Sequence, residues 1–212
     1  MKLKKINITL QENLLSNGLE VPTEMQKATF GKIKSGQDIV ILAPEEQGKT
    51  TAMIMAAIQR CEAPVEGEIA TRVLIVVKDK KEVERLIELF ELYSKYTGLR
   101  IFGTHDHTDM DDDKNQLSLG NDILIGTANR LNEMFSSAGF DVNQLKMYII
   151  DDLDVQLRNR LEPKLYRLSE SIGKTQRVYF AKDYVEEVMD MFLDKTMSED
   201  MEWLDFHEED ED

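Results

Sequence analysis

The sequence predicts one α/β domain built on a parallel, doubly wound sheet with helices on both faces. Six short runs of apolar and β-branched residues recur along the chain, and their apolar residues are contiguous instead of alternating with polar ones. Contiguous apolar runs of this length are typical of strands that are buried on both faces. Segments with helical patterns separate the runs, and this repeated order favours a parallel sheet.

The six predicted strands cover residues 38–43, 72–77, 100–103, 122–126, 147–151 and 177–181. Residues 49–60 are rich in Ala, Met and Ile, as in a helix that packs on a sheet. Residues 81–96 place Val83, Leu86 and Phe90 at helical spacing, with Lys and Glu between them. Methionines at helical spacings, such as Met53 and Met55, are expected to fill the core.

The composition limits the classes of function. The chain has 212 residues, 41 acidic and 26 basic, and a formal charge of −15. Its single cysteine, Cys61, excludes a disulfide framework and a Cys-rich zinc site. No apolar run approaches the roughly 18 residues of a membrane span, so we expect a soluble, cytoplasmic protein without membrane contact. The acidity argues against broad phosphate-backbone binding, and we expect no DNA specificity.

The negative charge is concentrated in residues 199–212, which contain nine acidic residues and no basic one. Such a segment buries too little to fold alone, so we expect a domain at residues 1–198 and an acidic tail at 199–212. The tail contains Trp203 and Phe206. Three interpretations remain open: a solvated tail, a tail packed on its own domain, or a segment that inserts these side chains into a partner's groove.

A second acidic cluster, at residues 109–113, is predicted to be an exposed loop. Two histidines, His105 and His107, precede it, and two His with carboxylates suit zinc. Nothing in the spacing arranges these side chains around a metal, so we expect a solvated loop instead of a metal site. Cys61 is expected to be packed, since no base is paired with it as in a nucleophile.

Residues that suit phosphate chemistry follow the first predicted strand. Residues 43–50 read Ala-Pro-Glu-Glu-Gln-Gly-Lys-Thr and end in Gly48-Lys49-Thr50. In a phosphate-binding loop the Lys reaches the β- and γ-phosphates and the Thr ligates Mg²⁺. Asp151, at the end of the fifth run, is a second candidate for Mg²⁺. The alternatives are a turn kept for the fold and an acid-rich helix N-terminus.

Five segments resemble, in the same order, the motifs of the DEAD-box RNA helicases, and the resemblance spans residues 6–195. They are residues 18–26 (the adenine-sensing Q motif), 43–50 (the phosphate loop), 116–131 (a stretch ending in Thr-Pro-Gly-Arg-Leu), 151–154 (Asp-Glu-Ala-Asp) and 180–183 (Phe-Ser-Ala-Thr). The resemblance implies the N-terminal RecA-like domain of that family. It implies ATP-binding roles for Thr23, Gln26, Gly48, Lys49, Thr50 and Asp151, a catalytic role for Asp152 and RNA-binding roles for Lys78, Thr127 and Arg130.

Several departures from the family pattern fall on the chemistry. Glu45 and Glu46 replace the Thr and Gly of the phosphate loop and put negative charge beside a triphosphate. The loop can still bind nucleotide if both side chains point into solvent. Asp152 is one methylene shorter than the family's Glu, and residues 181–183 lack both hydroxyls of Ser-Ala-Thr. The acidic segment also stands where these helicases have the linker to a second domain.

We therefore expect a stand-alone, degenerate DEAD-box-like domain. It would bind a protein or ribonucleoprotein partner, contact RNA weakly and hydrolyse Mg-ATP weakly or not at all. The alternative is a slow Mg²⁺-dependent ATPase, in which Lys49 and Thr50 hold the phosphates, Asp151 the metal and Asp152 the water. A third hypothesis is one half of a split helicase that another chain completes.

Overall fold

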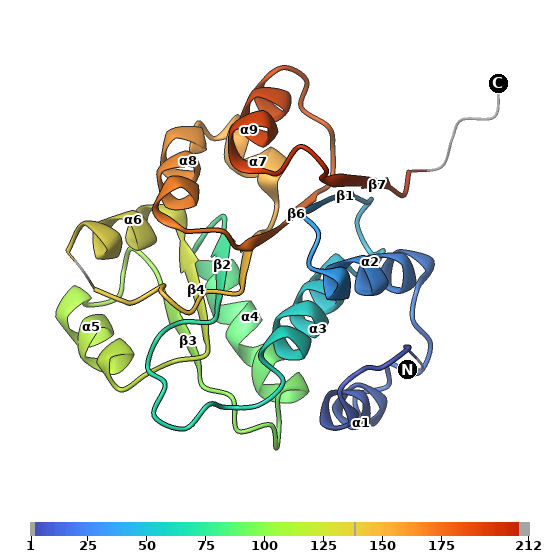
Figure 1. Cartoon of the computed structure of the whole chain (residues 1–212), viewed down its shortest axis with the longest axis horizontal. Coiled ribbons are helices and arrows are strands. Elements are labelled where there is room, and N and C mark those ends of the chain that lie inside the picture. The colour runs from blue at the N-terminus through green and yellow to red at the C-terminus, as the bar shows by residue number, and fades with distance from the viewer. Residues whose placement is uncertain (1–2, 138, 208–212) are drawn as a thin grey trace.

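The computed structural model describes residues 3–137 and 139–207. Within them, seven parallel strands form one sheet in the order β3-β4-β2-β5-β6-β1-β7 (Figure 1). The strands are β1 (Ile39–Leu42), β2 (Val73–Val77), β3 (Ile101–Thr104), β4 (Ile123–Thr127), β5 (Met147–Ile150), β6 (Gln176–Ala181) and β7 (Glu202–Asp205). The helices are α1 (Ile8–Ser16), α2 (Glu24–Ser35), α3 (Lys49–Cys61), α4 (Lys80–Tyr93), α5 (Met110–Ser118), α6 (Ala128–Ser136), α7 (Leu153–Arg158), α8 (Glu162–Ser171) and α9 (Val188–Thr196). The predicted doubly wound α/β architecture is confirmed, and the six runs form β1 to β6.

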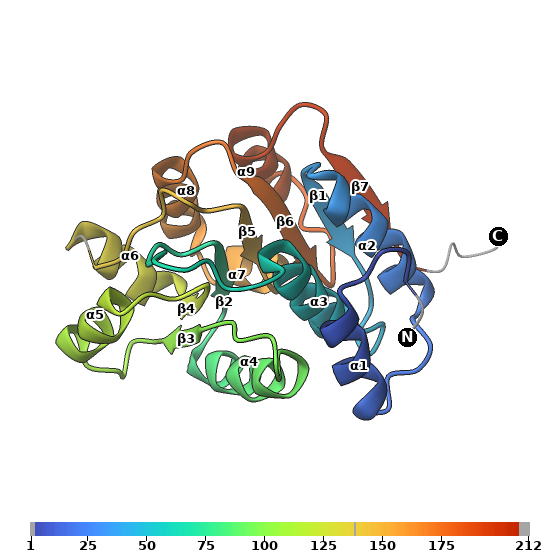
Figure 2. The same cartoon turned by 60° about the horizontal axis from the view of Figure 1, so that its bottom comes forward.

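The helices form two layers, one on each face of the sheet. Buried side chains of α1 to α4 form one core cluster with the strands, and those of α5 to α9 form a second on the opposite face (Figures 1 and 2). Alternate residues of a strand serve the two clusters: in β1, Ile39 and Ile41 belong to the first, and Val40 and Leu42 to the second. None of the helices in the described residues combines the length and apolarity needed to cross a bilayer.

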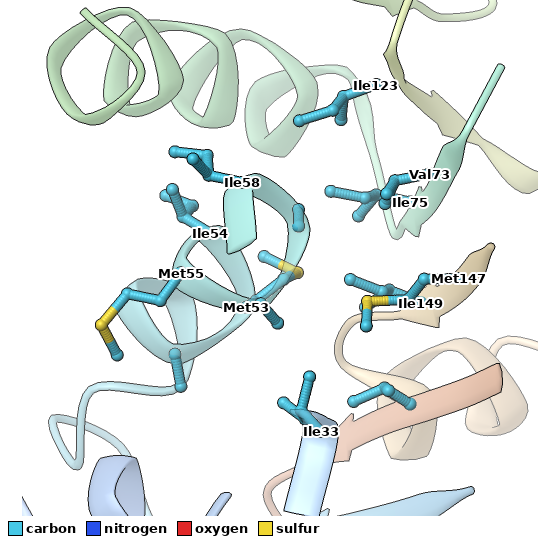
Figure 3. Close-up of a cluster of buried hydrophobic side chains, with 14 of the residues drawn as sticks. Ile33, Met53, Ile54, Met55, Ile58, Val73, Ile75, Ile123, Met147 and Ile149 are labelled. Carbon is cyan, nitrogen blue, oxygen red and sulfur yellow. The ribbon is translucent and has the colours of Figure 1, made fainter. Parts of the chain in front are cut away.

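Helix α3 packs on the centre of the sheet, as its composition predicts. Figure 3 shows its side chains, Met53 among them, facing those of β2 and β5. Met53 and Met55 are fully buried, which confirms that they fill the core. Cys61, at the end of the same helix, is packed as well, and burial raises the pKa of its thiol to about 12.

Strand β7 lies where the sequence predicts a tail. Glu202–Asp205 pairs in parallel with β1 along the outer edge of that strand. Leu204 and Phe206 pack against the core, whereas the side chain of Trp203 is 38% exposed. Of the three open interpretations, residues 202–206 therefore fit the second, a segment packed on its own domain. Residues 208–212 lie outside the described part of the chain. The sequence did not predict this strand because acidic residues outnumber the few apolar residues, such as Leu204 and Phe206, that alternate toward the core.

The acidic cluster at residues 109–113 begins helix α5 instead of forming a loop. Asp109 is the N-cap, and its carboxylate accepts hydrogen bonds from two backbone amides of the first turn. Acidic residues suit this turn because they complement the helix dipole. Asp113 is buried and accepts a hydrogen bond from the Thr104 hydroxyl (2.5 Å). His105 is buried too, at 8% exposure, so this part of the predicted solvated loop is wrong.

A buried ion cluster holds the sheet at the amino ends of three strands. Arg72, Arg100 and Asp122 directly precede β2, β3 and β4. Arg72 Nη2 lies 2.7 Å from Asp122 Oδ1, and Arg100 Nε lies 3.1 Å from Asp122 Oδ2. Arg72 also donates to the carbonyls of Cys61 (2.9 Å) and Ala63 (2.8 Å). Burial alone would raise the pKa of Asp122, but the hydrogen bonds from Arg100 and Arg72 outweigh it and hold that pKa below its ordinary value.

Replacing Asp122 by Ala leaves Arg72 buried without a counter-charge, so we expect a loss of about 3–5 kcal/mol in the free energy of unfolding at pH 7. Because the pKa of Asp122 is lower in the folded than in the unfolded chain, its stabilisation is present above about pH 4 and is lost as the pH falls through the folded value. Urea unfolding measures the free energy of unfolding of the wild type and of Asp122→Ala at pH 7 and pH 3. The difference between the two proteins should be smaller at pH 3 than at pH 7.

The matched control for this measurement is Glu88→Ala, an exposed carboxylate on α4. It should change the free energy of unfolding by less than about 0.5 kcal/mol. An equal gap between wild type and Asp122→Ala at both pH values would show that the charge of Asp122 does not stabilise the fold.

Candidate nucleotide-binding site

The carboxyl ends of four adjacent strands, β2, β5, β6 and β1, meet at one pocket of about 370 Å³. The residues that line it are Glu45, Glu46, Gly48, Lys49, Thr50, Lys78, Glu82, Arg85, Asp151, Asp152, Val155 and Lys182. Parallel strands all end at the same edge of a sheet, so side chains 137 positions apart, such as Glu45 and Lys182, come into contact here. Four of the predicted nucleotide-binding residues share this pocket: Gly48, Lys49, Thr50 and Asp151.

The phosphate loop makes its turn although one glycine of the family pattern is missing. Gly48 has a φ of +87° and is the N-cap of α3. Glu46, which stands where the family pattern has glycine, also has a positive φ of +67°. A side chain in this left-handed region costs roughly 1–2 kcal/mol. The substitution therefore changes the charge of the loop and adds strain, while the backbone retains a conformation that favours glycine.

Glu45 turns across the pocket toward the end of β6. Its Oε1 lies 3.0 Å from Nζ of Lys182, and its side chain is 77% exposed. The hydrogen bond from Lys182, together with the charge of that lysine, lowers the pKa of Glu45. Lys182 stands within the segment that replaces Ser-Ala-Thr. Glu45 and Lys182, which both depart from the family pattern, therefore form an ion pair with each other.

Lys49 fills the interior of its own loop. Its Nζ donates to the carbonyl of Ala43 and to that of Pro44 (2.7 Å). Burial lowers the pKa of Lys49, and the carboxylates of Asp151 and Asp152 oppose this effect. A phosphate group would have to displace these two carbonyls before it could accept hydrogen bonds from the Lys49 ammonium group.

Thr50 is engaged by an arginine that the sequence motifs do not contain. Nη2 of Arg85, on α4, donates to the Thr50 hydroxyl (3.2 Å) and lies 2.7 Å from Oε2 of Glu82. The available signal was the i, i+3 spacing of opposite charges in a helix that begins at the end of a strand. Sequence reasoning missed this residue, which adds a cation to the predicted site.

Asp151 and Asp152 are neighbours at the end of β5, but their surroundings differ. Asp151 is buried, and burial together with the charge of Asp152 raises its pKa to about 7. Asp152 has a φ of +48°, and its Oδ2 lies 2.7 Å from Nζ of Lys78. The hydrogen bond to Asp152 raises the pKa of Lys78. Lys78, predicted to contact RNA, thus lies in the nucleotide pocket and holds the side chain predicted to be catalytic.

Asp154 connects the end of β6 to helix α7. Its carboxylate is fully buried and accepts hydrogen bonds from the backbone amides of Lys182 (3.1 Å) and Asp183 (3.4 Å). It also accepts one from Nη1 of Arg158 (3.2 Å). The donors from the end of β6 are backbone amides. The absence of the two hydroxyls of the Ser-Ala-Thr motif therefore leaves the connection between this segment and α7 in place.

Thr23 and Gln26 connect helix α2 to the phosphate loop. Thr23 caps the helix, and its amide donates to Oε1 of Gln26 (3.0 Å), which completes a capping box. The Thr23 hydroxyl donates to the carbonyl of Gln47 (3.0 Å), and the Gln26 side chain donates to that of Gly48 (3.3 Å). A side chain at Gly48 would collide with Gln26. Both residues therefore hold the loop from outside the pocket.

Thr127 and Arg130, predicted to contact RNA, are buried away from the pocket. The Thr127 hydroxyl caps α6 and hydrogen-bonds the carboxylate of Asp106 (3.3 Å). Nε of Arg130 donates to the carbonyl of His105 (2.9 Å), and its Nη2 donates to that of Thr108. In this structure both side chains fasten the segment between β3 and α5.

The comparisons with known proteins agree with this geometry. The family model described as DEAD/DEAH box helicase matches residues 23–181. The ATP-dependent RNA helicase eIF4A of Candida albicans is 27% identical over 164 residues, which are 76% of this chain and 40% of that protein. The eukaryotic initiation factor 4A of Caenorhabditis elegans is 22% identical over 190 residues, which are 87% of this chain and 46% of that protein. The chain thus spans less than half the length of these relatives.

A solved structure shows the same fold. Dbp5 of S. cerevisiae, in a complex with Nup159, Gle1, IP6 and ADP, superposes with a TM-score of 0.82 at 14% sequence identity. The match covers 98% of this chain and 53% of the Dbp5 chain. Together with the family match over well more than half of the sequence, this fold shows that the chain belongs to the DEAD/DEAH box helicase family and forms its N-terminal RecA-like domain.

Proposed function

We propose that this domain is a binding module for a protein or ribonucleoprotein partner and hydrolyses ATP weakly or not at all. One observation carries the proposal: in the described part of the chain, groups of the protein itself engage every cation that lines the nucleotide pocket. The contacts are those of Lys182 with Glu45, Lys78 with Asp152, Arg85 with Glu82, and Lys49 with the carbonyls of Ala43 and Pro44.

The charge balance of the pocket disfavours a triphosphate. Its lining contains four basic side chains and five acidic ones, the latter being Glu45, Glu46, Glu82, Asp151 and Asp152. A triphosphate has to separate the existing ion pairs before it can bind the cations. Each carboxylate released in this way then repels the phosphates.

The residues that would hold Mg²⁺ also fit it poorly. Thr50 already accepts a hydrogen bond from Arg85, a cation that competes with a metal for its hydroxyl. Asp152, short by one methylene, is paired with Lys78, and a displacement of about 1 Å in a catalytic group can cost on the order of 10²-fold in rate.

RNA binding receives little support from the residues predicted to provide it. Lys78 is neutralised by Asp152, and Arg130 is buried and bonded to carbonyls. The formal charge of −15 opposes a phosphate backbone in general. A protein surface is therefore the better-supported partner. The Dbp5 structure, with Nup159 and Gle1 bound, provides a precedent for protein partners on this family.

The alternative function, a slow Mg²⁺-dependent ATPase, is favoured by one feature. Lys49, Thr50 and Asp151 line one pocket in the arrangement that the family resemblance implies. In this alternative Asp152 leaves Lys78 to position the attacking water, and another chain completes the site as in a split helicase.

Calorimetric titration of Mg-ATP and Mg-ADP separates the two functions. If the pocket is closed by its own charges, the wild type should bind more weakly than about 1 mM. The double variant Glu45→Thr/Glu46→Gly removes both acidic side chains and frees Lys182, so we expect its affinity for Mg-ATP to rise at least about tenfold.

The control for that gain is the triple variant that also contains Lys49→Ala, which should lose it because no ammonium group remains in the loop. Wild-type binding tighter than about 1 mM that disappears in Lys49→Ala, with measurable phosphate release, would refute the closed pocket and support the ATPase.

The strain in the phosphate loop leads to a separate prediction about stability. Glu46→Gly should raise the free energy of unfolding by up to about 1 kcal/mol, because glycine adopts a φ of +67° without the roughly 1–2 kcal/mol penalty of a side chain. Gln47→Gly, at the next position and without a positive φ, should lower it by about 0.5–1 kcal/mol. Thermal or urea unfolding checks both. A loss of stability in Glu46→Gly equal to that in Gln47→Gly would show that the loop is not strained.

A further inference from the structure

A second hollow, of about 460 Å³, lies between strand β7 and helix α9. We name it the β7–α9 groove. Its apolar floor consists of Leu42, Leu193 and Met201. Figures 1 and 2 show α9 beside the sheet edge that β1 and β7 form. The groove contains none of the residues of the nucleotide pocket.

Two half-exposed aromatic rings stand over this floor. Trp203 is 38% exposed and Tyr184 41% exposed, and their ring centroids lie 5.5 Å apart at an interplanar angle of 84°. Half-exposed aromatic rings are typical anchors of protein interfaces. The face of an indole also attracts a cation.

The remaining side chains of the groove are acidic. Asp190, Asp194 and Asp205 line it, and no basic residue does so in the described part of the chain. Asp190 accepts a hydrogen bond from the Tyr184 hydroxyl (2.6 Å), and Asp205 from the His207 ring (2.6 Å). Asp194 is exposed and forms no ion pair with any described residue. Aromatic rings surrounded by carboxylates form an environment for a cationic side chain.

One wall of the groove is an edge strand. β7 is the last strand of the sheet and pairs only with β1 among the described residues. The amides of Glu202 and Phe206 donate to the β1 side. Because amides alternate in direction along a strand, those of Trp203 and Asp205 face the open edge. Their side chains lie in the groove, so a strand added at this edge runs beside it.

From these features we propose that the β7–α9 groove binds an extended, basic segment of a protein partner. The segment adds a parallel or antiparallel strand to β7 and places an arginine or lysine side chain between Trp203 and the carboxylate of Asp194. This proposal rests on the binding role proposed above and names the partner's chemistry, but it does not depend on the state of the nucleotide pocket.

The charges of the same edge disfavour other occupants. A second copy of this chain would bring the carboxylates of its own groove, Asp194 and Asp205, toward the same carboxylates of the first copy, and like charges that face each other destabilise strand pairing. An RNA strand would meet three carboxylates and no cation. A basic peptide satisfies both the open backbone groups and the acidic side chains.

The experiment uses Trp203, the single tryptophan of the chain, as its reporter. The probe is an eight-residue peptide of alternating Arg and Val with blocked ends. It should change the Trp203 fluorescence saturably, with a Kd on the order of 100 µM that weakens as salt is added. The same peptide with Glu in place of Arg should bind at least about tenfold more weakly, as should one with Pro in place of Val, which cannot donate to a strand.

Two variants of the full chain localise the binding. Asp194→Lys, at an exposed position on α9, should weaken the Arg peptide at least about tenfold. Glu199→Lys makes the same charge change outside the groove and should have less than about a twofold effect. Equal losses in the two variants, equal binding of the Arg and Glu peptides, undiminished binding of the Pro peptide, or no saturation at 1 mM would each overturn the proposal. Tight ATP binding by a protein that still takes the Arg peptide would refute the closed nucleotide pocket and leave this groove intact.

Discussion

The central strands β1, β2, β4 and β5 have no exposed side chain, so polar groups can gather only where these strands end. This burial on both faces organises the rest of the molecule. At the amino ends, the carboxylate of Asp122 forms ion pairs with both Arg72 and Arg100. At the carboxyl ends, the phosphate loop and the acidic residues after β5 share one pocket with the end of β6. Both ends therefore contain ion pairs, and the apolar layers between them separate the two clusters.

The nucleotide pocket keeps backbone features of a phosphate-binding loop, but the charges around it differ from the family pattern. The turn at Glu46 and the cap at Gly48 retain the backbone of a phosphate loop, and Asp154 retains the connection to β6. The substitutions Glu45 and Lys182 then form a pair across the mouth of the pocket. In the described part of the chain, the cations of the pocket thus contact groups of the protein itself. The contacts that keep the fold run through the backbone, whereas nucleotide chemistry depends on side chains, several of which differ here from the family pattern.

The β7–α9 groove differs from the nucleotide pocket in how its charged side chains are paired. In the pocket every cation has a partner within the protein, while in the groove Asp194 has none among the described residues and no base lines the walls. The strand edge beside it also has open backbone groups. Under the proposed function, the nucleotide pocket is closed by its own charges and this acidic groove is the surface that binds a protein partner.

The sequence by itself determined the sheet, its first six strands and the family, because contiguous apolar runs and the order of five motifs are local properties. It also located Lys49, Thr50 and Asp151, which follow strands and therefore share an edge. Only the tertiary structure decided which charges neutralise each other, since Glu45 and Lys182, or Lys78 and Asp152, are distant in the chain. It likewise decided that residues 202–205 form a strand, because an acidic segment with few apolar residues becomes stable only when β1 offers it backbone partners and a core to cover.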